Sequence, residues 1–128
     1  MPKPVVSIEE IDIPNAGAPI YVAVISHTES HLSYNMNLEQ PPQPNKHIGR
    51  GTNSGTPHEL GTPTQLLRPQ DWLAAQIVVS RMAAGNTDYK VNLRFFQNGQ
   101  QVKESKLIKG KYTDDAPRVD IVISCHFK

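Results

Sequence analysis

Apolar and polar residues alternate along much of this chain with the two-residue period of β-strands. The clearest alternation has Tyr89, Val91, Leu93 and Phe95 as its apolar members and Lys90, Asn92 and Arg94 as its polar ones. Successive side chains of a strand point to opposite faces. This pattern therefore predicts a half-buried strand whose four apolar groups enter the core.

Four other segments have strand-like patterns. The segment 119–127 places Val119, Ile121, Ile123, Cys125 and Phe127 on one face, and we expect that face to share the core with the first strand. The segment 31–38 alternates in the same way. Residues 20–26 are apolar on both faces, which is typical of a central strand covered on both sides. In 5–13 the apolar residues change face across Glu9 and Glu10, and this change predicts a β-bulge.

Short connections between these segments predict which strands pair. The three residues 28–30 suit a hairpin that pairs 20–27 with 31–38, and 84–87 form a second reversal. Asn98 and Gly99 fit a two-residue type I′ turn. The strand after this turn has the wrong apolar phase, so we expect either a bulge near 103–105 or a short pairing after which Leu107 and Ile108 return to the core.

Residues 70–84 allow two interpretations. Their beginning resembles a helix start, whereas Ile77, Val78 and Val79 are β-branched and favour a strand. We predict a strand over about 75–83, with one helical turn before it. A helix over 70–84 would instead make the protein α+β.

The stretch 40–69 has no clear period and contains six prolines and four glycines. It predicts a long Pro/Gly-rich loop, the most mobile part of the chain, with a short helical turn near 58–60 or 63–67. Long loops in compact domains are commonly functional or disordered.

Together these elements predict an all-β fold with a single domain over 1–128. About seven strands with one long loop suit an antiparallel two-layer β-sandwich, and an immunoglobulin-like topology is a common form of it. A small β-barrel is the alternative. Trp72 is expected to plug the core or to cap one end of it.

Composition adds few constraints on function. The 128 residues carry a net charge of +1, so there is no overall attraction to a polyanion. Cys125 is the single cysteine, which excludes an intrachain disulfide. No apolar run has the length of a membrane span, and the first residues do not resemble a signal peptide. We expect a cytoplasmic protein without a membrane partner, although export without a cleaved signal stays open.

Two histidines offer the nearest approach to a metal motif. The predicted hairpin would make His27 and His31 neighbours, with Glu29 between them as a third ligand. The other histidines, His47, His58 and His126, are distant in the sequence. Two imidazoles are too few ligands for zinc, and we predict no metal and no cofactor.

Other candidate chemistry is weak. The glycine-rich segment 49–56 with Arg50 resembles a phosphate loop, but it lacks the required lysine and runs into Pro57. Cys125 and His126 are adjacent in a predicted strand and should point to opposite faces. Cys125 is therefore expected in the core.

Charge is distributed unevenly. The later strands carry the basic residues Lys90, Arg94, Lys103, Lys106, Lys109 and Lys111, and the first 39 residues carry the acidic residues Glu9, Glu10, Asp12, Glu29 and Glu39. Pairing between the two halves explains this as simply as a polyanion site does. Of the aromatic residues beside the basic ones, Tyr89 and Phe95 are assigned to the core and only Phe96 is left for base stacking, which disfavours nucleic acid.

These observations predict a non-enzymatic binding module that recognises a protein or glycan partner through loops, above all 40–69. One alternative is a small metal-dependent hydrolase that uses His27, His31 and the pair His58–Glu59. The other is a structural or assembly subunit whose edge strands pair with copies of itself.

Overall fold

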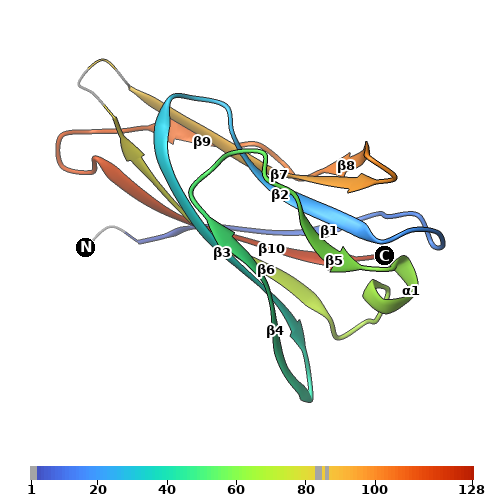
Figure 1. Ribbon diagram of the computed structural model, residues 1–128. Coiled ribbons are helices and arrows are strands. Elements are labelled where there is room, and N and C mark those ends of the chain that lie inside the picture. Colours follow the sequence, from blue (N-terminus) through green and yellow to red (C-terminus); the bar gives the residue numbers. More distant parts are fainter. Residues whose placement is uncertain (1–2, 83–84, 86) are drawn as a thin grey trace.

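The computed structural model describes residues 3–82, 85 and 87–128, and the described chain is a sandwich of two β-sheets (Figure 1). Its elements in chain order are β1 (Val5–Ile11), β2 (Ile20–Ser26), β3 (Ser30–Gln40), β4 (Gln43–Gly51), β5 (His58–Gly61), α1 (Pro63–Leu66), β6 (Trp72–Arg81), β7 (Asp88–Gln97), β8 (Gln100–Glu104), β9 (Ile108–Lys111) and β10 (Arg118–Phe127). The prediction of an all-β sandwich is confirmed, with ten strands in the described residues where seven were expected.

Strands that follow one another in the sequence often lie in different sheets. The first sheet has the order β1-β10-β6-β3-β4, and the second has the order β5-β2-β7-β8, with β9 also paired to β7. Neighbouring strands are antiparallel except β1 and β10, which are parallel. No helix in the described part of the chain is long and apolar enough to cross a membrane.

The core lies between the sheets and contains the predicted faces. Val91, Leu93 and Phe95 of β7 are fully buried, and Tyr89 is nearly so. From the opposite sheet Ile121, Ile123, Cys125 and Phe127 of β10 are buried, and Val119 packs against them. The rings of Phe95 and Phe127 meet edge to face, with their centroids 5.6 Å apart. The alternation of these two strands therefore predicted the core face of each sheet correctly.

The hairpin predicted at 28–30 is wrong. β2 pairs with β5 and β7 in the second sheet, whereas β3 pairs with β4 and β6 in the first. The connection is a corner that passes from one sheet to the other. Packed sheets are about 10 Å apart, and three extended residues span about that distance. A short connection therefore fits a crossing as well as it fits a hairpin.

The long loop predicted over 40–69 is also wrong, because β4, β5 and α1 lie within it. β4 is an edge strand whose first five side chains are exposed, so it has no apolar alternation to detect. Pro44 is tolerated there because an edge strand needs only one set of ladder bonds. The helical turn expected at 63–67 is confirmed as α1, which begins with a capping box between Thr62 and Gln65. Residues 58–60 belong to strand β5.

Residues 72–81 form strand β6, so the α+β alternative is wrong. Trp72 neither plugs nor caps the core: it is half-buried on the outer face of the first sheet, with its ring 5.1 Å from that of His126. Of the reversal predicted at 84–87, residues 84 and 86 lie outside the described residues.

The bulge expected in 5–13 is absent. β1 pairs with β10 in an unbroken register from Val5 opposite Ile121 to Ile11 opposite Phe127. The change of apolar phase has another cause, since Val6 and Ile8 point outward and are 58% and 67% exposed.

The turn at Asn98 and Gly99 is confirmed, with φ values of 55° and 75°. The bulge beyond the turn lies in β8 between Gln101 and Lys103, just before the predicted range 103–105. The register shifts there, so that Phe96 is opposite Gln101 and Phe95 is opposite Lys103. β8 ends at Glu104. Pairing with β7 then resumes at Ile108, which packs against the core, while Leu107 is 49% exposed.

Candidate functional site: an aromatic groove on the second sheet

The structure separates the histidines of the proposed metal motif. His27 follows β2 and its Nε2 lies 2.9 Å from Oδ1 of Asn92, an amide that is fully buried. His31 belongs to β3 in the other sheet, opposite Ser80, and is exposed. Among the described residues no group of three histidine, cysteine or acidic side chains is placed to hold a metal ion. His27 instead helps to satisfy the hydrogen bonding of Asn92, which also donates to the Ser105 carbonyl oxygen.

The other histidines have separate structural partners. Nε2 of His58 lies 2.7 Å from the Tyr34 hydroxyl, and the two rings meet edge to face. His47 lies 2.9 Å from Oδ1 of Asn35 on the first sheet, and His126 lies 2.9 Å from the Pro69 carbonyl oxygen. No two of these histidines are hydrogen-bonded to a common side chain in the described chain.

The glycine-rich segment 49–56 serves packing. A Cβ on Gly49 would collide with the ring of His58, and a Cβ on Gly51 would lie 2.8 Å from the Tyr34 hydroxyl. Both glycines belong to β4, with the exposed Arg50 between them on the opposite face. The segment therefore gives space to a tyrosine–histidine pair, and it is not folded as a phosphate-binding loop.

Cys125 and His126 point to opposite faces, as predicted. Burial raises the pKa of the Cys125 thiol to about 12, so the thiol stays protonated at neutral pH. Cys125 is a core residue and not a nucleophile paired with His126.

Among the described residues no salt bridge joins the acidic residues of the first 39 positions to the basic residues of the later strands, so the expected charge pairing between the two halves is not seen. Both carboxylate oxygens of Glu9 accept a hydrogen bond from the backbone N–H of Lys106, at 3.1 and 3.2 Å, and so tie β1 to the connection between β8 and β9. Glu10 pairs with Lys128 at 2.9 Å, and this hydrogen bond holds the pKa of Glu10 below its ordinary value. On the basic side, Lys90 lies directly opposite Lys109.

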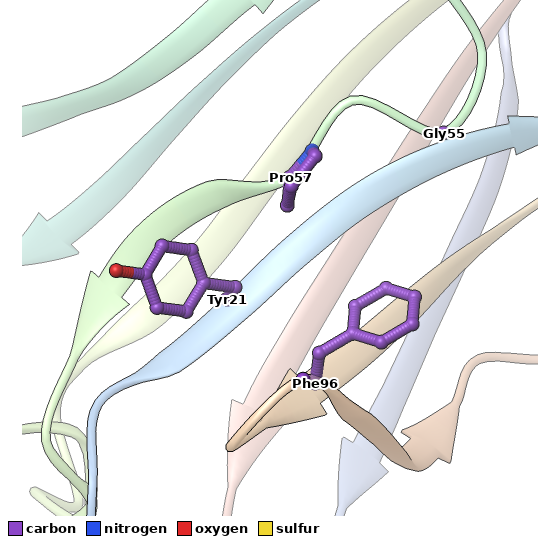
Figure 2. Close-up of a pocket in the computed structure, with 5 residues that line it drawn as sticks. Tyr21, Gly55, Pro57 and Phe96 are labelled. Atoms are coloured by element: carbon purple, nitrogen blue, oxygen red, sulfur yellow. The ribbon is translucent and has the colours of Figure 1, made fainter.

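A groove with a mainly apolar lining lies on the outer face of the second sheet (Figure 2). Tyr21 of β2 and Phe96 of β7 are directly opposite in the antiparallel register. Pro57 and Gly55 come from the connection before β5, and Gly99 comes from the β7–β8 turn. These five residues line a groove of about 400 Å³. Figure 2 shows the two rings standing on neighbouring strands beside Pro57.

The wall of the groove that carries Gly55 and Pro57 is fixed to β2 by backbone contacts. β5 pairs only with the beginning of β2, from Ile20 to Val22. The preceding connection then continues along the same edge: the N–H of Gly55 donates to the Val24 carbonyl oxygen at 2.9 Å, and the N–H of Ser26 donates to Oγ of Ser54 at 2.8 Å. The wall is therefore held in position although its own side chains are exposed.

One charged residue borders the groove. The hydroxyl of Tyr21 donates to Oε1 of Glu59 at 3.1 Å, and this bond together with the carboxylate charge raises the pKa of Tyr21. Glu59 is exposed. The groove thus combines two aromatic rings and a proline with the Glu59 carboxylate at one side.

The sequence pattern does not reveal this site. It predicts that both faces of 20–26 are covered, whereas the face that carries Tyr21 is covered at Ala23 and open at Tyr21, which is 37% exposed. For Phe96 it suggests only a residue free for base stacking. Two consecutive phenylalanines in a strand were the available signal, because one of them must face away from the core.

Comparison of the chain with protein-family models, with curated proteins and with solved structures finds no significant match. The function is therefore inferred from the groove itself.

Proposed function

We propose that this protein is a non-enzymatic binding module that holds an extended, apolar segment of a protein partner in the groove formed by Tyr21, Pro57 and Phe96. The observation that carries the proposal is the pair of aromatic rings placed directly opposite each other on an outer sheet face. Such a face is normally covered by polar side chains. Exposed aromatic residues in a concave site are typical of recognition surfaces.

The shape of the groove favours an extended segment. Proline-rich and extended peptides dock in grooves lined by aromatic rings, because the peptide loses little conformational freedom on binding. The absence of a Cβ at Gly55 and Gly99 leaves the two sides of the groove open. A proline or an aliphatic side chain of the partner would lie between the rings, and a basic residue beside it would approach Glu59.

The lining favours a protein partner over a glycan. A sugar presents many hydroxyl groups, each of which needs a hydrogen-bonding partner when it leaves water. The side chains that line the groove are two aromatic rings and a proline, and the Tyr21 hydroxyl already donates to Glu59. An apolar peptide segment loses fewer hydrogen bonds with water on entering such a groove.

The hydrolase alternative receives no support from the geometry. His27 and His31 lie in different sheets, and the His58 imidazole is engaged by Tyr34. Four expectations from the sequence stay predictions: an immunoglobulin-like topology, a cytoplasmic location, the absence of a metal or cofactor, and the absence of nucleic-acid binding.

The test starts from peptides selected from a random displayed library on the wild-type protein, with a glycan array probed in parallel. Selected peptides should be rich in proline and aliphatic residues and should perturb the NMR signals of residues 55–57 and 96–99. Phe96→Ser and Tyr21→Ser should each weaken binding about tenfold or more. Tyr21→Phe keeps the ring and should bind nearly as well as the wild type.

Met82→Ser is the matched control, because Met82 is 53% exposed and follows β6 of the first sheet, whereas the groove lies on the second sheet. It should bind the selected peptides as the wild type does. Peptides that bind equally well to Phe96→Ser and Tyr21→Ser would overturn the proposal. A glycan that perturbs the groove signals while no peptide does so would overturn the choice of partner.

A further inference from the structure

β1 forms an unprotected edge of the first sheet. It is the outermost strand in the order β1-β10-β6-β3-β4, and in the described chain it pairs only with β10. Its pairing with β10 is regular over all seven residues, so the opposite side of β1 presents a straight row of backbone N–H and carbonyl groups. Such a row is a template for another strand.

The other edges of the sandwich carry features that hinder pairing. β4 contains Pro44 and Lys46, and its register against β3 shifts twice. β5 has four residues. β8 and β9 divide the far edge of β7 into two strands of five and four residues, each with lysines. Proline, charged side chains, bulges and short length are the usual protections of a sheet edge. β1 has no proline, no lysine and no register shift, and its charged residues, Glu9 and Glu10, both lie in its last three positions.

The side chains next to this edge are apolar. Val6 and Ile8 point to the outer face and are 58% and 67% exposed, and Val122 of β10 lies beside Val6 in the parallel register. Val6 and Ile8 are two of the five large hydrophobic residues that are exposed in the described chain. Their exposure has no role in the sandwich itself.

We propose that a second copy of this chain covers this edge, with the two β1 strands antiparallel about a two-fold axis at Ser7. This interaction goes beyond the peptide-binding function and uses the opposite sheet. It gives the assembly-subunit alternative a specific surface. The first sheets of the two copies then join into one continuous sheet. Because each copy uses the same strand for this contact, assembly through β1 stops at a dimer.

The side-chain pattern is complementary to itself in this register. An axis at Ser7 places Val6 of each copy opposite Ile8 of the other, so four aliphatic side chains form one cluster on the outer face. An axis at Ile8 would instead place each Val6 opposite Glu10 and separate the two halves of this cluster, whereas the axis at Ser7 places a valine opposite a glutamate, Val5 opposite Glu9, only on the inner face. On the inner face Lys3 of one copy lies diagonal to Glu9 of the other, which pairs opposite charges across the contact. Glu10 is neutralised within its own chain by Lys128.

The oligomeric state tests the surface. Sedimentation equilibrium of the full chain over micromolar to millimolar concentrations should show a monomer–dimer equilibrium. Ile8→Lys should weaken self-association about tenfold or more, because the two-fold axis applies the substitution twice. Met82→Lys is the matched control, since Met82 is 53% exposed and follows β6, which β10 separates from β1, and it should dimerise normally. Circular dichroism and urea unfolding check that both variants fold.

Cysteine cross-linking tests the register. Directly opposed residues of antiparallel strands have Cα atoms about 4.5–5.5 Å apart, within the range of a disulfide. Ser7→Cys should therefore give a covalent dimer on mild oxidation, whereas Ile8→Cys should not, and the buried Cys125 does not interfere.

Three results would overturn the proposal. The first is a wild-type chain that stays monomeric at all concentrations. The second is a dimer that survives Ile8→Lys but is lost in Phe96→Ser, which would place self-association in the groove. The third is cross-linking of Ile8→Cys without Ser7→Cys, which would exclude the axis at Ser7. The peptide-binding measurements are independent of all three, so each proposal can fail alone.

Discussion

Phe95 and Phe96 are adjacent residues of the same type on opposite faces of β7, so alanine substitutions at the two positions measure what each face contributes. Phe95 is fully buried and packs edge to face on Phe127. Phe96 is half-buried and lines the groove. The same side chain is removed in both variants, and only its surroundings differ.

The expected losses of unfolding free energy follow from burial. Phe95→Ala removes a core side chain and leaves a cavity between the sheets, which costs about 3–5 kcal/mol. This is a large part of the about 5–15 kcal/mol that stabilises a typical domain. Phe96→Ala leaves no enclosed cavity. Full burial of a phenylalanine is worth about 1.5–3 kcal/mol, so loss of a half-buried one should cost roughly 1 kcal/mol.

Urea unfolding followed by tryptophan fluorescence is a suitable assay, because Trp72 is the single tryptophan and lies on the other sheet, away from both substitutions. Far-UV circular dichroism provides a second probe, and coincident transitions would establish two-state unfolding. A loss below about 1 kcal/mol for Phe95→Ala, or equal losses for the two variants, would refute the assignment of faces.

Three other measurements test particular contacts. Gly49→Ala should destabilise the protein by about 1–3 kcal/mol, because its Cβ collides with the ring of His58, whereas Gly85→Ala, with open space around it, should cost less. The thiol of Cys125 should not react with Ellman's reagent near neutral pH until urea unfolds the chain, and rapid labelling of the folded protein would contradict its burial. Burial raises the pKa of Tyr34, so the folded chain keeps a proton that the unfolded chain loses near pH 10. The free energy of unfolding should therefore fall as pH rises from about 9 to about 11. This fall should be smaller in Tyr34→Phe. An equal fall in Tyr34→Phe would assign the effect to other groups.

The sequence predicted the core faces because their signal is local. In β7 and β10 the buried apolar side chains alternate with residues that are half-buried or exposed, Asn92 excepted, so the apolar period follows directly from burial. The same local signal was absent where burial does not alternate. β4 is exposed along most of its length, and β1 carries apolar side chains on its solvent face. A pattern that assumes buried apolar residues therefore predicts neither the presence of β4 nor the regular pairing of β1.

Strand pairing and the groove could not be predicted, because both depend on residues that are distant along the chain. A short connection after β2 is compatible with a hairpin and with a crossing between sheets. The crossing is determined by the distant partners of the two strands, since β2 pairs with β7 and β3 pairs with β6. The groove needs a residue from each of three separate segments, at positions 21, 57 and 96. Two aromatic residues and a proline at these positions have no regular spacing in the sequence that would mark them as a site.

The parallel pairing of β1 with β10 joins the earliest described strand to the latest one. β10 is also an inner strand of the first sheet, held between β1 and β6, so that sheet cannot form until β10 is available. The contacts that complete the sheet also close the longest loops in the chain, which makes them slow to form. The first sheet should therefore form late in folding, and until β10 is in place both edges of β1 are open to pairing with other chains.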